Sequence, residues 1–220
     1  MKQLAIVGYG KMGHMVESLA GGYGFDDIVT IDVNDPLSPA SVAIEFSTPE
    51  AAPQNLRKLA GMRVPTVCGT TGWFHELPEI QQAFETAGTP LVWSPNFSIG
   101  VNIFFRLAEE AARLTAQYED YGAWAWEIHH NAKKDAPSGT LLRAVERMKA
   151  AGYPRSIDVS SNRAGAVPGT HEIGFDSAAD TITLRHTARS REGFARGALQ
   201  AARWIAGKSG VHEFSQIVFG

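Results

Sequence analysis

The sequence contains a single cysteine, Cys68, so no disulfide bond can form within the chain. A chain without disulfides has no need of an oxidising compartment, and we expect it in the reducing cytoplasm. Long hydrophobic runs are also missing. The apolar segment at residues 3–7 is far too short for a transmembrane helix or a signal peptide, so we expect no membrane partner.

No charge of one sign dominates the chain. Its 20 Lys and Arg residues against 23 Asp and Glu residues leave a net charge of -3, which gives no electrostatic reason to expect nucleic acid or an anionic membrane as a partner. Internal repeats and low-complexity segments are absent too. With 220 residues, 44% of them hydrophobic, the chain can form one or two globular domains with a substantial core.

A glycine motif follows the first predicted strand, at residues 3–7, and precedes a helical pattern that runs to Ala20. It is a G-x-G-x-x-G made up of Gly8, Tyr9, Gly10, Lys11, Met12 and Gly13. The motif alone is a weak signal, but a strand before it and a helix after it are typical of a dinucleotide-binding loop. Asp32, near the end of a second predicted strand at residues 28–33, lies where an acidic residue binds ribose hydroxyls. A tight turn in another α/β protein is the alternative.

Strands and helices then alternate regularly. Apolar patterns predict strands at residues 42–46, 63–68 and 90–94, a helix that begins at 47–50, and a helix at 75–86. This alternation favours a doubly wound parallel sheet. Cys68 lies inside a strand and is interpreted as a small core residue rather than a nucleophile.

Two further loops end predicted strands of this sheet. One contains Gly69, Thr70 and Thr71, and the other contains Ser94, Pro95, Asn96 and Phe97. Open α/β sheets bind ligands at the carboxyl ends of their strands, so both loops are candidate parts of a cofactor site. The small residues of the first loop let its backbone approach a flat ring, although a plain connection remains the alternative.

The pattern changes after the long amphipathic helix predicted at residues 99–117. Strands are predicted at 123–129, 157–162, 170–175 and 181–189, with one helix among them at 140–150. This order favours a second domain with a mixed or antiparallel sheet. We therefore expect a dinucleotide-binding domain at 1–98 and 192–220, to which a helix at 191–205 returns, and a substrate-binding and oligomerisation domain at 99–191.

Residues 127–140, EIHHNAKKDAPSGT, concentrate titratable groups between a strand and a helix. His129 or His130 can exchange a proton near neutral pH, and Lys133 supplies positive charge or a proton. A solvated loop is the alternative for each pair of like residues. No metal is expected, because the adjacent histidines have no cysteine or carboxylate at ligand spacing.

The helix after this loop starts near Ser138, Gly139 and Thr140. We expect the backbone N–H groups of these residues to be unpaired and directed outward, where they suit a carboxylate or a phosphate. Further along, Arg163 and His171 flank a turn. They can reach the substrate or a neighbouring subunit, and a solvated arginine with a half-buried histidine is an equally good interpretation.

The sequence resembles the 4-hydroxy-tetrahydrodipicolinate reductase (dihydrodipicolinate reductase) family of lysine and diaminopimelate synthesis. The resemblance extends over nearly the whole chain, and its most specific part is His-His-x-x-Lys followed by Asp-Ala-Pro-Ser-Gly-Thr. The motifs that carry it are GYGKMG at 8–13, CGTTGW at 68–73, SPNFSIGVN at 94–102, HHNAKKDAPSGT at 129–140, RAGAVPGTHE at 163–172 and HTARSREGFARGAL at 186–199.

The resemblance implies a Rossmann-like α/β domain, a mixed-sheet α+β substrate domain, and NAD(P)H-dependent reduction of 4-hydroxy-tetrahydrodipicolinate, a cyclic imine with two carboxylates. It implies His129 and Lys133 as the acid/base pair. It also assigns the substrate carboxylates to His130, Lys133, Ser138, Gly139 and Thr140. The glycine loop with Asp32 is expected to hold the adenosine half of the cofactor, and the loops at 69–71 and 94–97 the nicotinamide end. The sequence departs from the family in its short stretch at 33–41 and in Asn131-Ala132 between the histidines and the lysine.

The choice of cofactor rests on charge. Asp32 can accept hydrogen bonds from the ribose hydroxyls of NADH but repels the 2′-phosphate of NADPH, and residues 33–36 offer no cation. Lys11 is the one counterweight, so we expect NADH to be preferred with NADPH activity retained. The resemblance also implies a homotetramer. Another two-domain nicotinamide oxidoreductase, such as an amino-acid dehydrogenase, and a non-catalytic dinucleotide sensor are the alternative functions.

Overall fold

The computed structural model describes residues 3–33 and 35–220, so Asn34, one of the residues used in the charge argument at 33–36, lies outside the described part. The chain divides into two compact units, Met1–Ile99 with Glu192–Gly220 and Gly100–Arg191. Each unit has its own sheet and core. No helix in the described ranges is both long and apolar enough to cross a membrane.

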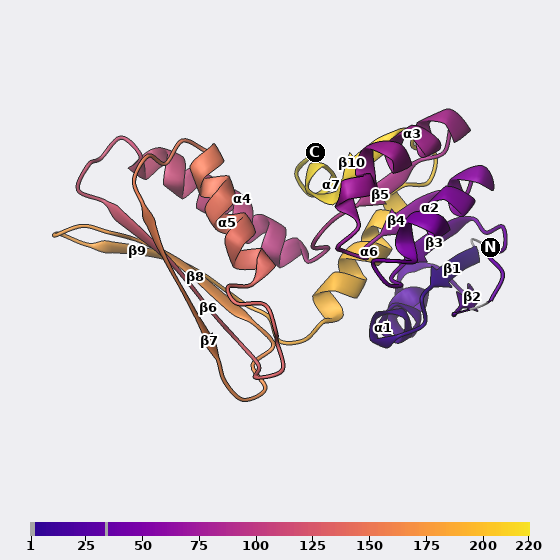
Figure 1. Cartoon of the computed structure of the whole chain (residues 1–220), viewed down its shortest axis with the longest axis horizontal. Helices are drawn as coiled ribbons and strands as arrows, with labels where there is room; N and C mark the ends of the chain where they lie inside the picture. Colours follow the sequence, from indigo (N-terminus) through magenta and orange to yellow (C-terminus); the bar gives the residue numbers. More distant parts are fainter. Residues whose placement is uncertain (1–2, 34) are drawn as a thin grey trace. The chain divides into compact units, whose positions relative to one another are not determined.

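The first unit is built on a parallel sheet, to which the described residues contribute six strands (Figure 1). Its order is β10-β5-β4-β3-β1-β2, and every pair is parallel. The strands are β1 Gln3–Val7, β2 Asp27–Ile31, β3 Val42–Glu45, β4 Thr66–Cys68, β5 Leu91–Trp93 and β10 Val211–Glu213. Because all strands run the same way, the loops at 8–13, 69–71 and 94–97 share one edge of the sheet, as predicted.

Helices cover both faces of this sheet, which explains the unbroken apolar runs of its strands. Leu4 and Ile6 pack in one cluster with α1 (Lys11–Ala20) and α6 (Glu192–Trp204). Ala5 and Val7, on the opposite face, pack with Leu59 of α2 (Ala52–Gly61). The helix α3 (Leu77–Ala87) lies on the same face as α2, and the short η1 (Gly21–Tyr23) and η2 (Phe74–Glu76) precede β2 and α3. The predicted Rossmann-like, doubly wound α/β unit is confirmed.

Two local predictions are wrong in this unit, and two short elements were not predicted. The helix expected to begin at 47–50 begins at Ala52. Thr48 forms a turn before it, in which the Thr48 Oγ1 accepts a hydrogen bond from the Ala51 amide at 3.3 Å. The strand expected from Arg63 begins at Thr66, since Arg63 has a positive φ of 54°. The sequence pattern also missed β10 and the helix α7 (Phe214–Phe219), both too short to show a periodicity.

The second unit packs two helices against one mixed sheet (Figure 1). The sheet order is β7-β6-β8-β9, with β6 parallel to β7 and the other pairs antiparallel. Its elements are α4 Ile99–Thr115, β6 Gly122–His129, α5 Gly139–Ala150, β7 Ile157–Arg163, β8 Thr170–Asp176 and β9 Thr181–Thr187. The prediction of a second domain with a mixed sheet is confirmed.

The strand β6 decides which side chains face the helices. Its residues alternate between buried and half-buried positions, and Ala123 and Ala125 join the core formed with α4 and α5. The same alternation places Glu127 and His129 on that buried face. Trp124, on the opposite face, occupies the space that the missing side chain of Gly174 leaves, since a Cβ there would lie 2.2 Å from the indole.

Candidate active site

The glycine loop after β1 is shaped by close backbone packing at two of its glycines. Gly8 has a positive φ of 91°, and a Cβ on it would lie 2.4 Å from the carbonyl oxygen of Phe46. A Cβ on Gly13 would lie 2.5 Å from the Gly8 oxygen. A Cβ on Gly10, in contrast, meets no described atom within 4 Å. The first and third glycines are thus required by the fold, and the second leaves room for a ligand.

The start of α1 suits an anion. Gly10 is its N-cap, no side chain in the described part of the chain caps it, and its first turn holds no acidic residue. Lys11 is exposed beside it, and Met12 is half-buried in the core cluster. The Tyr9 hydroxyl donates to Glu17. A pyrophosphate fits such a helix start, where N–H groups and the helix dipole favour negative charge.

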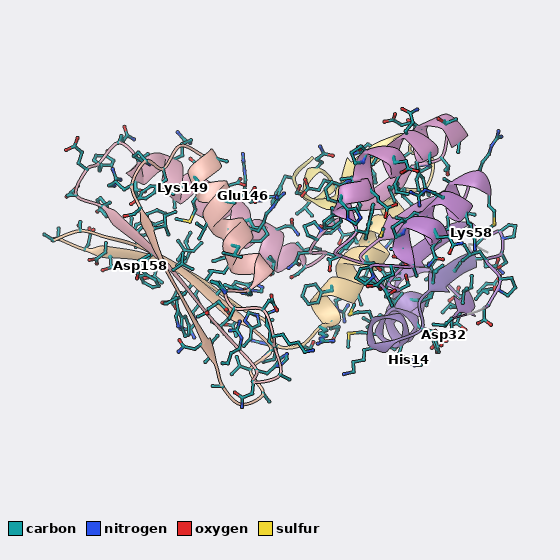
Figure 2. The ribbon with its side chains drawn as sticks, in the orientation of Figure 1. His14, Asp32, Lys58, Glu146, Lys149 and Asp158 are labelled. Carbon is teal, nitrogen blue, oxygen red and sulfur yellow. The ribbon has the colours of Figure 1, made fainter. Side chains whose placement is uncertain are left out.

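Two carboxylates lie at the end of β2. Asp32, labelled in Figure 2, is exposed just after the strand, and its Oδ1 accepts a hydrogen bond from the Val33 amide at 2.8 Å. Asp35 accepts one from the Asp32 amide at 2.9 Å. This turn therefore presents negative charge where the ribose of a dinucleotide is expected.

The loop after β4 also packs tightly. A Cβ on Gly69 would lie 2.1 Å from the ring of Phe46, so only glycine fits there. Thr70 is buried, and its Oγ1 has no hydrogen-bond partner among the described residues. The Trp73 indole N–H donates to the Thr70 carbonyl oxygen at 2.8 Å, while Thr71 is exposed. A buried hydroxyl without a partner in this loop fits a ligand contact.

The loop after β5 contains four predicted cofactor residues, Ser94, Pro95, Asn96 and Phe97. The Ser94 hydroxyl donates to the Asn96 carbonyl oxygen at 2.9 Å and closes a turn around the exposed Pro95. The Phe97 ring is buried against Phe214, with centroids 4.7 Å apart. Its side chain is therefore part of the core, so the predicted contact of Phe97 with the cofactor falls to its backbone.

Glu127 is the centre of the polar cluster in the second unit. Its side chain is fully buried, although it carries a carboxylate. The carboxylate Oε2 is hydrogen-bonded to Nδ1 of His129. The Oε1 atom accepts from Arg163 Nη1 at 2.9 Å and from the Ser138 amide at 3.2 Å. The guanidinium and these hydrogen bonds compensate a charge that would otherwise be costly to bury.

Strand register brings a second histidine to this cluster. His171 of β8 lies opposite Glu127, and its Nε2 is 3.1 Å from the Ser138 hydroxyl. Its buried Nδ1 has no hydrogen-bond partner in the described ranges. Burial, followed by repulsion from His129, His186 and Lys133, lowers the pKa of His171 to about 3. The His171 ring is therefore neutral at physiological pH.

Burial favours the neutral form of His129 as well. Burial lowers its pKa below the usual value, and the Glu127 carboxylate opposes this effect. The ring lies 5.0 Å from that of His171, edge to face. A Cβ on Gly169 would lie 2.8 Å from Nε2 of His129, so the glycine keeps the space beside this nitrogen open.

The loop between β6 and α5 places a lysine and an aspartate together. The Lys133 amide donates to the His130 carbonyl oxygen at 3.1 Å, and the Lys133 Nζ pairs with Asp135 Oδ1 at 2.9 Å. Asp135 Oδ2 accepts from the Gly139 amide at 3.3 Å. The charge of Lys133 acts on His129, so the predicted acid/base residues lie in one electrostatic environment. His130 and Thr140 are half-buried at the two ends of the loop.

The expectation of unpaired N–H groups at the start of α5 is wrong for two of the three residues. The Ser138 amide donates to Glu127, and the Gly139 amide donates to Asp135. Ser138 is buried, and its hydroxyl accepts from the Leu141 amide as an N-cap. The reason is that nearby carboxylates satisfy the helix start within the chain itself.

Sequence reasoning missed Glu127 and left Arg163 and His171 open. The structure places Arg163 against Glu127 and buries His171 to 5% exposure. The alternation along the strand was a usable signal, because Glu127 shares the parity of Ala123 and Ala125. A carboxylate on the apolar side of a strand, two residues before a histidine, indicates a paired group.

The same residues raise the question of a metal. Glu127, His129 and His171 each offer a ligand atom, all within 4.8 Å of one another, so the expectation that the histidines have no carboxylate at ligand spacing is wrong. Glu127 already bonds His129, Arg163 and Ser138, and the guanidinium charge opposes a second cation. The arrangement is therefore interpreted as a hydrogen-bond network.

The chain matches known proteins along nearly its whole length. Residues 17–97 match the family profile "Dihydrodipicolinate reductase, N-terminus", and residues 100–218 match "Dihydrodipicolinate reductase, C-terminus". The 4-hydroxy-tetrahydrodipicolinate reductase of Christiangramia forsetii is 34% identical over 98% of this chain and 97% of its own. That of Anaeromyxobacter dehalogenans is 34% identical over 94% of this chain and 83% of its own.

Solved structures agree on the fold. The dipicolinate-bound dihydrodipicolinate reductase from Paenisporosarcina sp. TG-14 has a TM-score of 0.80, covers 99% of each chain and is 21% identical. At this identity the likeness concerns the fold, whereas the two family profiles and the relatives at 34% identity establish descent. From the glycine loop, the polar cluster on β6 and these matches, we conclude that the chain belongs to the dihydrodipicolinate reductase family.

Proposed function

We propose that the chain reduces 4-hydroxy-tetrahydrodipicolinate to tetrahydrodipicolinate in lysine and diaminopimelate biosynthesis. Family membership makes it an NAD(P)H-dependent oxidoreductase. The observation that carries the proposal is the cluster on β6, in which a buried carboxylate holds His129 next to the charge of Lys133. A dinucleotide sensor has no need of such a cluster, and this disfavours it.

The reaction joins one substrate, one reduced nicotinamide and one proton, and it releases water and the oxidised nicotinamide. When bound, the nicotinamide supplies the hydride that the substrate carbon accepts. The chain must then deliver a proton to the substrate. We assign this to His129 with Lys133. Nε2 of the neutral His129 ring takes up a proton from the Lys133 ammonium or from water, and the imidazolium so formed passes it to the substrate.

The substrate carries two carboxylates, and the loop before α5 offers groups that bind one. Asp135 already lies between Lys133 Nζ and the Gly139 amide, so these two donors accommodate a carboxylate. A substrate carboxylate that displaces Asp135 gains the same two contacts. We include His130 and Thr140 in this subsite, and Ser138 as the residue that shapes it through the cap of α5.

For the cofactor we propose a preference for NADH with NADPH activity retained. Asp32 and Asp35 place two carboxylates at the end of β2, where the 2′-phosphate of NADPH would lie close to them. Lys11, exposed at the start of α1, carries the positive charge that favours the 2′-phosphate of NADPH. The Gly8–Gly13 loop, the loop at 69–71 and the loop at 94–97 are the proposed cofactor contacts.

For assembly we propose a homotetramer that uses the outer face of the second sheet. The helices α4 and α5 pack on the other face. The outer face forms a shallow groove of about 520 Å³, lined by Trp124, Trp126, Asp158, Ser160, Glu172 and Arg185. Half-buried tryptophans beside paired charges are typical of surfaces that associate with a second copy. Light scattering at micromolar concentration tests it, and a monomer contradicts it.

The central test is an assay coupled to the preceding synthase, with NADH and NADPH followed by absorbance in parallel. We expect turnover with both, and a substrate panel that includes amino acids separates this function from that of an amino-acid dehydrogenase. Dipicolinate, a flat mimic of the substrate, should inhibit competitively and raise the Tm, more so with cofactor present. Absence of turnover together with no Tm shift at millimolar dipicolinate contradicts the proposal.

A further inference from the structure

A carboxylate and an imidazole face one another at the end of β6. Glu127 and His129 are two residues apart on one strand, so both side chains project to the same buried face. Oε2 of Glu127 is bonded to Nδ1 of His129. An ionised carboxylate only accepts hydrogen bonds, so Nδ1 must carry the proton in this pair.

The other carboxylate oxygen is fixed by two donors. Arg163 Nη1 and the Ser138 amide both point at Oε1, at 2.9 and 3.2 Å. Arg163 is itself held by the carbonyl oxygens of Asn162 and Asp135. Rotation of the carboxylate away from His129 would therefore break its ion pair with Arg163 and leave the Ser138 amide at the helix start without its acceptor.

A proton on Nδ1 leaves Nε2 for the ligand. Nε2 faces the side of Gly169, where a Cβ would lie only 2.8 Å away. The missing side chain leaves the space beside this nitrogen unfilled. In a histidine, the partner of one ring nitrogen decides what the other can do.

The charged and titratable groups around His129 come from every neighbouring element. Glu127 of β6 favours the imidazolium, and it is opposed by Lys133 of the following loop and by Arg163 of β7. His171 of β8 faces the ring edge to face, with His186 of β9 next to it in register. Glu127 is thus the group in this set that favours a positive charge on His129.

We propose that Glu127 is a positioning residue for proton transfer: it holds one proton on Nδ1 of His129, so that Nε2 takes up a second proton and passes it to the substrate. The inference rests on the proposed function and extends it to a residue without substrate contact. Arg163 and Ser138 hold Glu127 in turn, so hydrogen bonds connect the start of α5 to His129 through Glu127.

Glu127→Gln tests this sharply. Arg163 and Ser138 keep the amide oxygen at the Oε1 position, so the amide NH₂ faces His129 and Nδ1 must accept its hydrogen bond. The neutral ring then carries its proton on Nε2, and the imidazolium is disfavoured. We expect kcat to fall on the order of 100-fold, with KM within about threefold. The pH–rate limb of His129 should move to lower pH, because the charge that raises its pKa is removed.

The matched control is Glu109→Gln. Glu109 lies on α4 and, like Glu127, pairs with an arginine, Arg147, at 3.0 Å, but it lies outside the cluster on β6. It should keep the parent kcat and pH profile. Glu127→Asp, which retains the charge, should recover part of the kcat lost in Glu127→Gln.

Nitrogen-15 NMR of the histidine rings at pH 7.5 gives a readout independent of turnover. The parent should show His129 protonated on Nδ1, and Glu127→Gln should show it protonated on Nε2. A parent ring protonated on Nε2 overturns the inference even if the variant fails to fold. Parent-like kcat in Glu127→Gln overturns it too, as does a loss of dipicolinate binding parallel to the loss of kcat. If the parent turns over no substrate, the proposed function fails, and the NMR result still decides the role of Glu127.

Discussion

The loops at the carboxyl edge of the first sheet depend on glycines, which have no side chain. The end of β6 in the second unit depends instead on buried polar side chains. Gly8 and Gly69 lie so close to Phe46 that no Cβ fits, and this leaves backbone groups to face a ligand. Around Glu127, in contrast, buried charges satisfy one another. Backbone surfaces suit a cofactor shared by many enzymes, and placed charges suit one substrate and one proton transfer.

Removing a charge from the second unit should have the largest effect. Lys133→Ala loses a carboxylate contact and a proton source. We expect the transition-state stabilisation, calculated from kcat/KM, to decrease by about 3 to 5 kcal/mol. His129→Ala should mainly lower kcat. Lys134→Ala, at the exposed neighbouring lysine, is the control and should resemble the parent. Near-normal steady-state kinetics in both active-site variants contradict the assigned active site.

Adding a side chain to the first unit should have the next largest effect. Gly10→Ala places a methyl group where no described atom lies within 4 Å, so the Tm should change little. The methyl group obstructs the approach of a pyrophosphate, and we expect NADH binding to weaken by about 2 kcal/mol, the range of one hydrogen bond to a charged group. Gly21→Ala, also in open space, is the control. Unchanged NADH affinity by calorimetry contradicts the assigned loop.

The buried histidine of the second unit should make stability depend on pH. Because the pKa of His171 is lowered to about 3, the unfolded chain binds the proton more readily than the folded chain. The stabilising contribution is complete above about pH 6.5 and is lost as pH falls toward 3. Between pH 7.5 and 5 we expect a loss of about 2 kcal/mol in the free energy of unfolding.

His171→Gln removes this titration and keeps a polar group near Ser138. Its free energy of unfolding, from urea titrations, should differ between the two pH values by about 2 kcal/mol less than that of the parent. His75→Gln, at a side chain that is 75% exposed, should keep the parental difference. Equal pH dependence in the parent and in His171→Gln contradicts the assignment.

The smallest effect concerns the cofactor end of the first unit. Asp32→Ala removes one of two carboxylates after β2, and the preference for NADH should narrow or reverse by about 1 to 2 kcal/mol, roughly tenfold in kcat/KM. The change should come chiefly from weaker use of NADH. Asp26→Ala, at an exposed aspartate before β2, is the control. A parent with lower KM and higher kcat for NADPH shows that the charge argument is wrong.

The contrast between the units also explains which parts were predictable. A loop defined by glycines is contiguous, so Gly8, Gly10 and Gly13 appear in the sequence as one motif between a strand and a helix. The stretch from His129 to Thr140 is contiguous as well, and it indicated a proton-transfer and anion site. Alternating strands and helices likewise sufficed for the doubly wound sheet, because parallel strands need helical crossovers.

The sequence by itself determined the two kinds of sheet, the glycine loop and the His129–Lys133 segment, since each depends on residues close together in the chain. Only the tertiary structure decided that Arg163 and His171 join Glu127, because the register of β7 and β8 against β6 brings them together. It also decided that the amides of Ser138 and Gly139 are paired within the chain. Pairing across strands is set by the packing of whole elements, which no local pattern records.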